Sequence, residues 1–109
     1  MKHVPIGDLE LAALLSVLRL GGDAYGAEIR RDLSERSGRD YSVGGIYTTL
    51  QRLEDKGLLR SSMSEPTAVR GGRAKRLFRI TALGERAVRQ QRELKIALWQ
   101  DADLKLRST

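Results

Sequence analysis

The clearest helical pattern of apolar and polar positions lies between residues 41 and 59, YSVGGIYTTLQRLEDKGLL. Four apolar residues in this stretch recur at helical spacing and therefore share one face: Val43, Ile46, Leu50 and Leu53. Ser42 is a good N-cap, and Gly57 fits the left-handed position that commonly ends a helix. The stretch predicts one short helix with both of its ends marked.

The opposite face of this expected helix is unusual for a surface in contact with water. A surface helix ordinarily carries long charged side chains, but the first two turns here contain two glycines, a tyrosine and two threonines. Small and hydrogen-bonding groups at the positive end of a helix dipole suit a close approach to phosphates and base edges. The alternative is a surface helix that tolerates weak helix formers at its start. The residues expected to face outward are Gly44, Thr48, Gln51, Arg52 and Asp55, with Tyr47 on the flank.

Two more helices are expected before this one. The first is capped by Asp8 and stopped by Gly21-Gly22, and the second begins at about Asp23 or Ala24 and is stopped by Gly38. The first has an apolar stripe of Leu11, Leu14, Leu15 and Leu18, widened by Leu9 and Val17. The second directs three residues inward, Tyr25, Ile29 and Leu33.

After the third helix the pattern changes from helical to extended. Residues 59–63 and 75–80 predict two strands, and the second of them places Phe78 and Ile80 on one side. Residues 64–74 contain a proline and a glycine pair and predict a loop. The two strands are therefore expected to form a hairpin with a long tip.

A last helix is expected to be capped by Thr81 and to run to about Leu104. A helix of this length projects beyond a core formed by residues 1–80, and its distal apolar surface then needs a partner. The simplest partner is the same helix of a second subunit, and the alternative is that the helix folds back on its own domain. The residues expected at the dimer interface are Leu94, Leu98, Trp99 and Ala102.

Charge adds one local feature to this picture. The chain has 109 residues, enough for one domain, and its formal net charge of +6 favours a polyanionic partner. Between Pro66 and Gly84 there is no acidic residue. The same segment contributes five of the six excess positive charges, on Arg70, Arg73, Lys75, Arg76 and Arg79.

Three helices followed by a basic hairpin predict a winged helix-turn-helix, a mainly α fold with a small β-hairpin. Residues 1–80 would form this DNA-binding domain, and residues 81–109 a C-terminal dimerisation helix. The third helix would enter a major groove, and the hairpin would lie along the DNA backbone or a minor groove. A loop that merely extends into solvent is the alternative for the hairpin tip. The residues expected at DNA are Ser42, Gly44, Gly45, Tyr47, Thr48, Gln51, Arg52, Arg70, Arg73, Lys75 and Arg76.

The chain resembles the PadR family of bacterial transcriptional regulators, in particular its short members with a single C-terminal helix. The resemblance covers roughly residues 8–84 and is carried by four segments: DLELAALLSVL, DAYGAEIRRDLSERSG, VGGIYTTLQRLEDKGLL and GGRAKRLFRIT. It implies a dimeric DNA-binding repressor, often of transporter or stress genes and sometimes released by a small molecule. The chain departs from many relatives at Gly44-Gly45, which bears on base preference. In some relatives aromatic side chains near the dimer centre help to form a site for flat hydrophobic compounds. Trp99 is accordingly either packing at the dimer interface or an effector contact.

Two other classes of function fit less well. An enzyme would need converging catalytic groups, but the single histidine is His3, near the N-terminus, and the chain has no cysteine. A winged-helix adaptor that binds protein instead of DNA would not need five cations and no acids in its hairpin. No apolar run approaches the roughly 20 residues of a membrane helix, so we expect a cytoplasmic protein without cofactor or metal.

Overall fold

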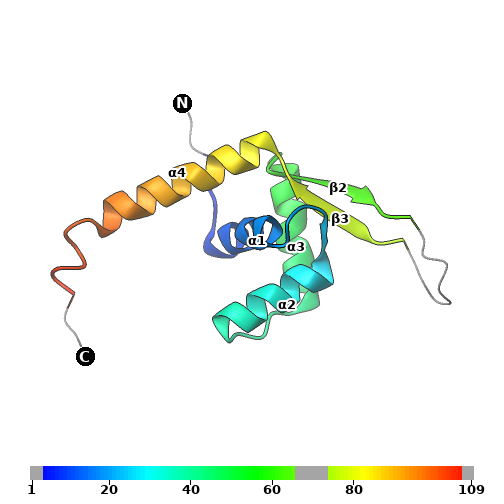
Figure 1. Cartoon of the computed structure of the whole chain (residues 1–109), viewed down its shortest axis with the longest axis horizontal. Coiled ribbons are helices and arrows are strands. Elements are labelled where there is room, and N and C mark those ends of the chain that lie inside the picture. The colour runs from blue at the N-terminus through cyan, green and yellow to red at the C-terminus, as the bar shows by residue number, and fades with distance from the viewer. Residues whose placement is uncertain (1–3, 66–73, 107–109) are drawn as a thin grey trace.

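The computed structural model describes residues 4–65 and 74–106 of the chain. Its elements are α1 (Asp8–Arg19), β1 (Ala24–Tyr25), α2 (Gly26–Ser37), α3 (Val43–Asp55), β2 (Leu59–Met63), β3 (Arg76–Ile80) and α4 (Ala82–Trp99). The helices α1, α2 and α3 pack together, the hairpin of β2 and β3 extends from them, and α4 passes over α1 and projects beyond it (Figure 1). This arrangement confirms the predicted winged helix-turn-helix with an additional C-terminal helix.

The sheet contains one strand that the sequence pattern did not predict. In the described residues it has three antiparallel strands in the order β1-β3-β2. Ala24 pairs with Phe78, so the expectation that the second helix begins at about Asp23 or Ala24 is wrong. A strand of two residues is too short to show a period of two, and for this reason it was missed. The helix α2 itself ends as predicted, with Gly38 in the left-handed conformation at φ 70°.

Both ends of α3 follow from the residues that occupy them. The hydroxyl of Ser42 accepts a hydrogen bond from the backbone N–H of Gly45 at 3.0 Å. Gly57 is left-handed at φ 78°, and the N–H of Leu58 donates to the carbonyl of Leu53 at 2.9 Å. This bond is the six-residue closure of a Schellman motif. The predicted boundaries of the third helix are confirmed.

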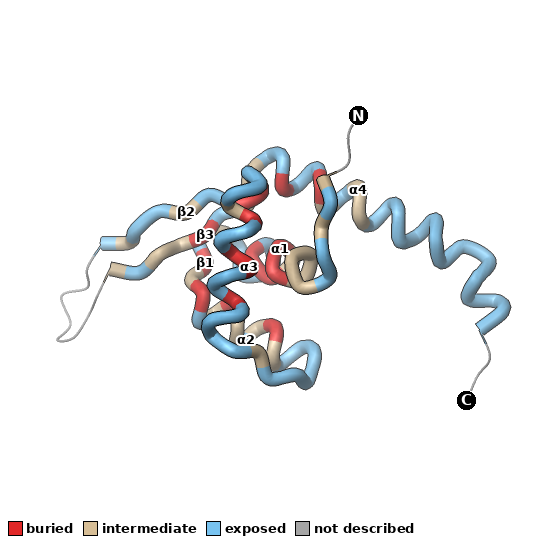
Figure 2. Tube along the Cα trace, turned by 180° about the vertical axis from the view of Figure 1, so that it is seen from behind, coloured by how far each residue is buried: buried red, intermediate tan, exposed pale blue. Residues whose placement is uncertain are grey.

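The buried core lies where the three helices meet the sheet, as the buried residues in Figure 2 show. Phe78 and Leu14 are among its largest fully buried side chains. One expected core residue is wrong: Val43 is 56% exposed, because it occupies the first position of α3, at the edge of the packed region. Thr49 is buried on this side of α3, and its hydroxyl donates to the carbonyl of Gly45 at 2.9 Å.

The first helix differs from its prediction at its start and along its apolar stripe. Gly7, not Asp8, is the N-cap, and its N–H donates to the carboxylate of Glu10 at 2.8 Å. Asp8 is the first helical residue, where its charge still favours the helix dipole. Only part of the expected stripe is fully buried: Leu14 and Val17 are, whereas Leu18 is 41% exposed.

The last helix begins as predicted and ends earlier. The hydroxyl of Thr81 accepts a hydrogen bond from the N–H of Gly84 at 3.0 Å, so Thr81 is the N-cap. The helix stops at Trp99, five residues before the expected Leu104, and Ala102 therefore lies outside it. Within α4 only Gly84 and Ala87 are buried, and the distal half is exposed along its length (Figure 2).

Candidate nucleic-acid interface

The outward face of α3 is open over its first two turns. Gly44, Gly45 and Thr48 are exposed, and a Cβ atom added at Gly44 would meet no atom within 4 Å. Gln51 and Arg52 continue the same exposed face by one turn. The predicted division of α3 into buried and outward residues is therefore confirmed, except at Val43. A ligand can approach the helix backbone closely at this point, next to the positive end of the helix dipole.

Tyr47 lies at the side of this face, and its ring lies against the start of α2. Its ring occupies the space above Gly26, where an added Cβ would lie 2.5 Å from the ring carbon that bears the hydroxyl. The side chain remains 40% exposed. Gly26 therefore permits the ring position, and a larger residue there would displace it. This contact could not be predicted from the sequence, because the two residues are 21 positions apart.

The hairpin carries fewer unpaired positive charges than its sequence suggests. Arg70 and Arg73 lie outside the described residues. Arg79 forms an ion pair with Asp23 at 3.0 Å, and Arg76 forms one with Glu54 at 2.7 Å. Both acidic partners come from other parts of the chain, so a count of charges along the segment could not reveal them. The positive charges of these two arginines are therefore partly balanced by carboxylates of the same chain.

Lys75 and Arg60 are the two cations that form no ion pair in the described part of the hairpin. Lys75 lies directly before its second strand. It is exposed, and among residues 4–65 and 74–106 it forms no ion pair. Its ammonium nitrogen lies 4.1 Å from the centre of the Tyr25 ring. A cation–π contact of this kind orients the side chain without neutralising it.

Three carboxylates hold their charges through specific partners. The hydrogen bond from Ser61 is the main reason that the pKa of Glu54 is lowered; burial opposes it, and Arg76 adds to it. The hydrogen bond from Arg19 is the main reason that the pKa of Asp32 is lowered. Burial is the largest influence on the pKa of Glu10 and raises it, but the N–H of Gly7 and the ammonium of Lys56 together lower it. Asp32 links α2 to α1, Glu10 links α1 to the end of α3, and Glu54 links α3 to β3.

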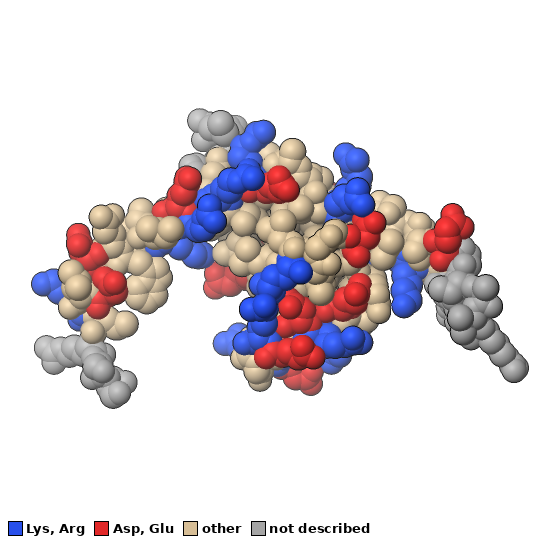
Figure 3. Space-filling view, viewed as in Figure 1, with Lys and Arg blue, Asp and Glu red and all other residues tan. Residues whose placement is uncertain are grey.

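Acidic and basic side chains are interspersed elsewhere on the surface. Figure 3 shows both signs together over α2, without a large field of one sign. Ion pairs account for part of this mixture: Arg19 and Arg36 both contact Asp32, and Arg30 contacts Asp40. The outer side of α2 is therefore a solvated surface on which part of the charge is paired.

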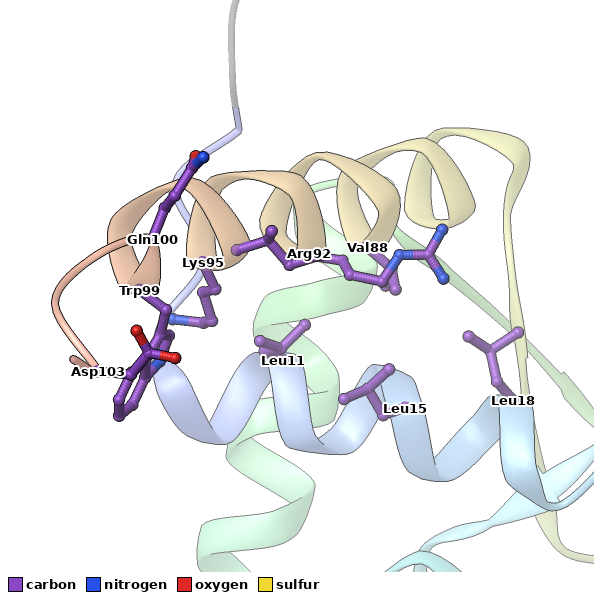
Figure 4. Close-up of a pocket in the computed structure, with 10 residues that line it drawn as sticks. Leu11, Leu15, Leu18, Val88, Arg92, Lys95, Trp99, Gln100 and Asp103 are labelled. Carbon is purple, nitrogen blue, oxygen red and sulfur yellow. The ribbon is translucent and has the colours of Figure 1, made fainter. Parts of the chain in front are cut away.

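A second surface feature is an apolar groove of about 870 Å³ between α1 and α4. Leu11, Leu15 and Leu18 of the incompletely buried α1 stripe form one wall (Figure 4). The other wall comes from α4 and the turn after it: Val88, Arg92, Lys95, Ile96, Trp99, Gln100 and Asp103. In Figure 4, Trp99 and Asp103 stand together at one end of the groove.

The residues predicted for a dimer interface divide between two places. Trp99, 58% exposed, lines the groove. Leu94 and Leu98 are 45% and 66% exposed and lie on α4 outside the groove lining. Ile96 was missed by the sequence prediction, although it is 63% exposed and lines the groove.

The described part of the chain contains neither a cluster of metal ligands nor a helix able to span a membrane. No three histidine, cysteine, aspartate or glutamate residues within residues 4–65 and 74–106 are placed to hold a metal ion. In the same ranges, no helix combines the length and the apolar character that a bilayer crossing requires.

Comparison with known proteins agrees with this geometry. Residues 14–90 match the model of the "Transcriptional regulator PadR-like family". The chain belongs to the PadR-like family of transcriptional regulators. A relative within curated proteins is the transcriptional regulator Rv3488 of Mycobacterium tuberculosis, 40% identical over 83 residues that span 74% of this chain and 73% of that protein.

Solved structures of PadR-like proteins share the fold. A PadR-like regulator from Bacillus cereus has a TM-score of 0.74 at 19% identity, with 93% of each chain covered. Bacillus subtilis PadR, in a structure described as a complex with operator DNA, has a TM-score of 0.64 at 20% identity. That match covers 76% of this chain and 46% of the other. At identities of 19% and 20%, these two comparisons support the same fold for this PadR-like protein and no more than the fold.

Proposed function

We propose that this PadR-like regulator is a sequence-specific DNA-binding protein that acts as a dimeric repressor. In this proposal α3 enters the major groove, and the hairpin follows the DNA backbone or a minor groove. The observation that carries the proposal is the open face of α3, formed by Gly44, Gly45, Thr48, Gln51 and Arg52. It combines small residues for close approach with side chains that can bond to base edges.

The hairpin supports the same proposal. Lys75 offers a charge without an ion pair among the described residues, and Tyr47 of α3 is 40% exposed. Backbone contacts of this kind fix the register of a protein on DNA without reading its sequence. The operator complex of Bacillus subtilis PadR provides a precedent within the family fold for DNA as the ligand.

The apolar groove and the distal half of α4 supply the dimer in this proposal. Twelve large hydrophobic residues of the described chain are exposed, and six of them lie in the distal half of α4 or follow it: Leu94, Ile96, Leu98, Trp99, Leu104 and Leu106. A second copy of α4 would cover this surface and the groove at once. Two-fold pairing would place two α3 helices at successive major grooves. The operator would then be an inverted repeat with half-sites about 10 base pairs apart, or a multiple of that.

Trp99 is the only tryptophan of the chain and lines the groove, so it is the candidate contact for a small hydrophobic effector. An effector that shares the groove with the partner helix would change the dimer geometry and release DNA. The indole fluorescence of Trp99 tests this directly. It should respond to a hydrophobic dye in the dimer, and Leu15→Glu in the opposite wall should abolish the response. A dye response that persists unchanged in this variant would place the ligand elsewhere.

Selection of bound sequences from random DNA tests the main function. The enriched sequences should contain an inverted repeat, and a reporter gene behind that repeat should be repressed in the presence of the protein. Arg52→Ala should then weaken operator binding by about 1–3 kcal/mol and relax the preference at one base, if Arg52 contacts a guanine edge. Equal losses on operator and random DNA would show that Arg52 contacts phosphate only. Failure to enrich any sequence would favour the alternative of a protein-binding winged-helix adaptor.

A further inference from the structure

Arg76 joins the hairpin to the outward side of α3. It begins β3, opposite Met63 of β2. One terminal nitrogen, Nη2, lies 2.7 Å from Oε2 of Glu54 and 3.1 Å from Oε1 of Gln51. The guanidinium carbon lies 5.0 Å from the centre of the Phe78 ring. The charged group is therefore held from several sides by its own chain.

The amide of Gln51 is fixed in one orientation by this arrangement. Its nitrogen donates to Oδ1 of Asp55 at 2.9 Å, and its oxygen accepts from Arg76. A half-turn of the amide would set its N–H group against the guanidinium and its oxygen against the carboxylate. Both contacts would then be repulsive, because a guanidinium only donates and an ionised carboxylate only accepts. Gln51 is exposed, and within the described residues one N–H and one oxygen lone pair of its amide remain unused.

We propose that Arg76 is a positioning residue for base reading, which holds the amide of Gln51 ready for an adenine, and that it does not neutralise a DNA phosphate. This proposal rests on the DNA-binding function proposed above. An amide that presents one donor and one acceptor side by side is the group that pairs with the N6 and N7 positions of adenine. Fixing it in advance lowers the entropy lost on binding and favours that base over others.

Glu54 explains why the charge of Arg76 is not available to DNA. Its carboxylate binds Arg76 and also accepts the hydroxyl of Ser61, at 2.5 Å and 2.6 Å from its two oxygens. The pKa of Glu54 is lowered, first by Ser61 and then by Arg76, although burial opposes this change. The carboxylate is therefore ionised at neutral pH. A phosphate brought close to Arg76 would meet this negative charge as well.

Lys75, the preceding residue, provides a matched control. It is exposed and forms no ion pair within the described residues, so it is a hairpin cation suited to phosphate. The methionine variants Lys75→Met and Arg76→Met remove one charge each and keep an unbranched apolar stem. Binding of each full-length variant would be measured across a salt series, on a duplex selected from random DNA and on a duplex of random sequence.

The two variants should fail in different ways. Lys75→Met should reduce the slope of log K against log salt by about 0.9 on both duplexes and leave the ratio of specific to random affinity unchanged. Arg76→Met should leave the slope unchanged and lower the ratio roughly tenfold. Gln51→Ala should lower the ratio by a similar factor, and should add nothing further in the Arg76→Met background. A purely structural role for Arg76 would not produce this coupling.

Other outcomes overturn the proposal and are distinguishable from a failure of the proposed function. A slope lowered by about 0.9 in Arg76→Met, with an unchanged ratio, would make Arg76 a phosphate contact. Additive losses in the double variant would separate Arg76 from Gln51. Amide proton resonances of the Gln51 side chain give a reading that needs no DNA: unchanged positions in Arg76→Met would also overturn the proposal. Equal binding of wild-type protein to both duplexes would instead remove the DNA-reading function itself.

Discussion

Two helices of this protein expose faces of opposite chemistry. The outward face of α3 carries small and polar residues such as Gly44, Thr48 and Gln51, whereas the distal half of α4 exposes Ile96 and Trp99. A polar face loses little by contact with water, but a large apolar side chain gains about 1.5–3 kcal/mol when it is covered. The difference indicates two kinds of partner, a polar polyanion for α3 and another apolar surface for α4.

The two helices also differ in how their own domain holds them. The inner side of α3 is buried along most of its length, through Ile46, Thr49, Leu50 and Leu53. Burial in α4 is confined to Gly84 and Ala87 in its first two turns. One helix is thus anchored by the monomer before any ligand binds. The distal half of the other is exposed, and in the proposed dimer it would be covered by the second subunit.

Removal of the residues after Arg92 should have the largest effect on this comparison. The winged helix should remain folded because its core residues all precede Arg92. The dimer should dissociate, and operator affinity should fall by about 10²–10⁴-fold through the loss of the linked second half-site. Light scattering measures the change of mass, and circular dichroism confirms folding. A truncated chain that stays dimeric would place the interface elsewhere, most plausibly on α1, and remove the role of Trp99.

Gly84→Ala should break the anchored end of α4. An added Cβ would lie 2.2 Å from the carbonyl oxygen of Leu58, a backbone atom that cannot move aside cheaply. We expect a loss of about 3 kcal/mol in the free energy of unfolding, the upper end for overpacking. Urea unfolding followed by circular dichroism measures it. Gly21→Ala is a less suitable comparison because its φ of 78° adds backbone strain, so Ala82→Ser, at an exposed position of the same turn as Gly84, serves as the control.

Gly44→Ala, in α3, should change stability and DNA binding in opposite directions. Its Cβ would meet nothing within 4 Å, and alanine favours a helix over glycine by about 1 kcal/mol at most. The free energy of unfolding should therefore rise slightly, while operator affinity falls because the added methyl group keeps DNA away. Thermal unfolding and operator binding, measured on the same preparation, give both values. A variant that is more stable and binds as tightly as wild type would mean that DNA does not approach Gly44.

Acid should weaken the ion pairs that anchor α1, α2 and α3 by a smaller amount. The pKa values of Asp32 and Glu54 are lower in the folded protein than their ordinary values of 3.8 and 4.5. Folding therefore favours the ionised forms. This stabilisation is complete above the ordinary values and is lost as the pH falls through the lowered ones. Because the pairs are partly exposed, each contributes about 1 kcal/mol or less.

Urea midpoints measured between pH 6 and pH 2 (a range of about two units on either side of the ordinary carboxylate pKa) would show this loss. Asp32→Asn should be less stable than wild type at neutral pH and should show a shallower decline with acid. If the decline were as steep in Asp32→Asn as in wild type, the contacts of Arg19 and Arg36 with Asp32 would carry no share of it.

Helices with strong end signals could be predicted from the sequence, and contacts between distant residues could not. Ser42 and Gly57 marked α3 correctly, and Thr81 marked the start of α4. The end of α4 was placed too late, because Leu104 continued the apolar spacing past Asp101, which is left-handed at φ 66°. Periodicity reports which residues can share a face, but not where the backbone leaves the helix.

The candidate site was predicted as a set of outward residues but not as a network. The exposed positions of α3 followed from its spacing. The pairing of Arg76 with Glu54 joins residues 22 positions apart, and that of Arg79 with Asp23 joins residues 56 apart. Such pairs arise only when the hairpin folds against the helices. For this reason the pairing of these two arginines could not be predicted from the charge pattern.

The turn that ends α3 also has a mechanical consequence. The carbonyls of Gly57 and Leu58 accept hydrogen bonds from the hydroxyl and the N–H of Thr81, at 2.7 Å and 3.1 Å. Gly84 sits against the same carbonyl of Leu58, with no room for a side chain. The turn that follows α3 and the first turn of α4 thus form a rigid connection between the two helices. We expect a tilt of α4 to move α3 with it. In the proposed dimer, the distance between the two α3 helices would then depend on the angle at which the two α4 helices cross.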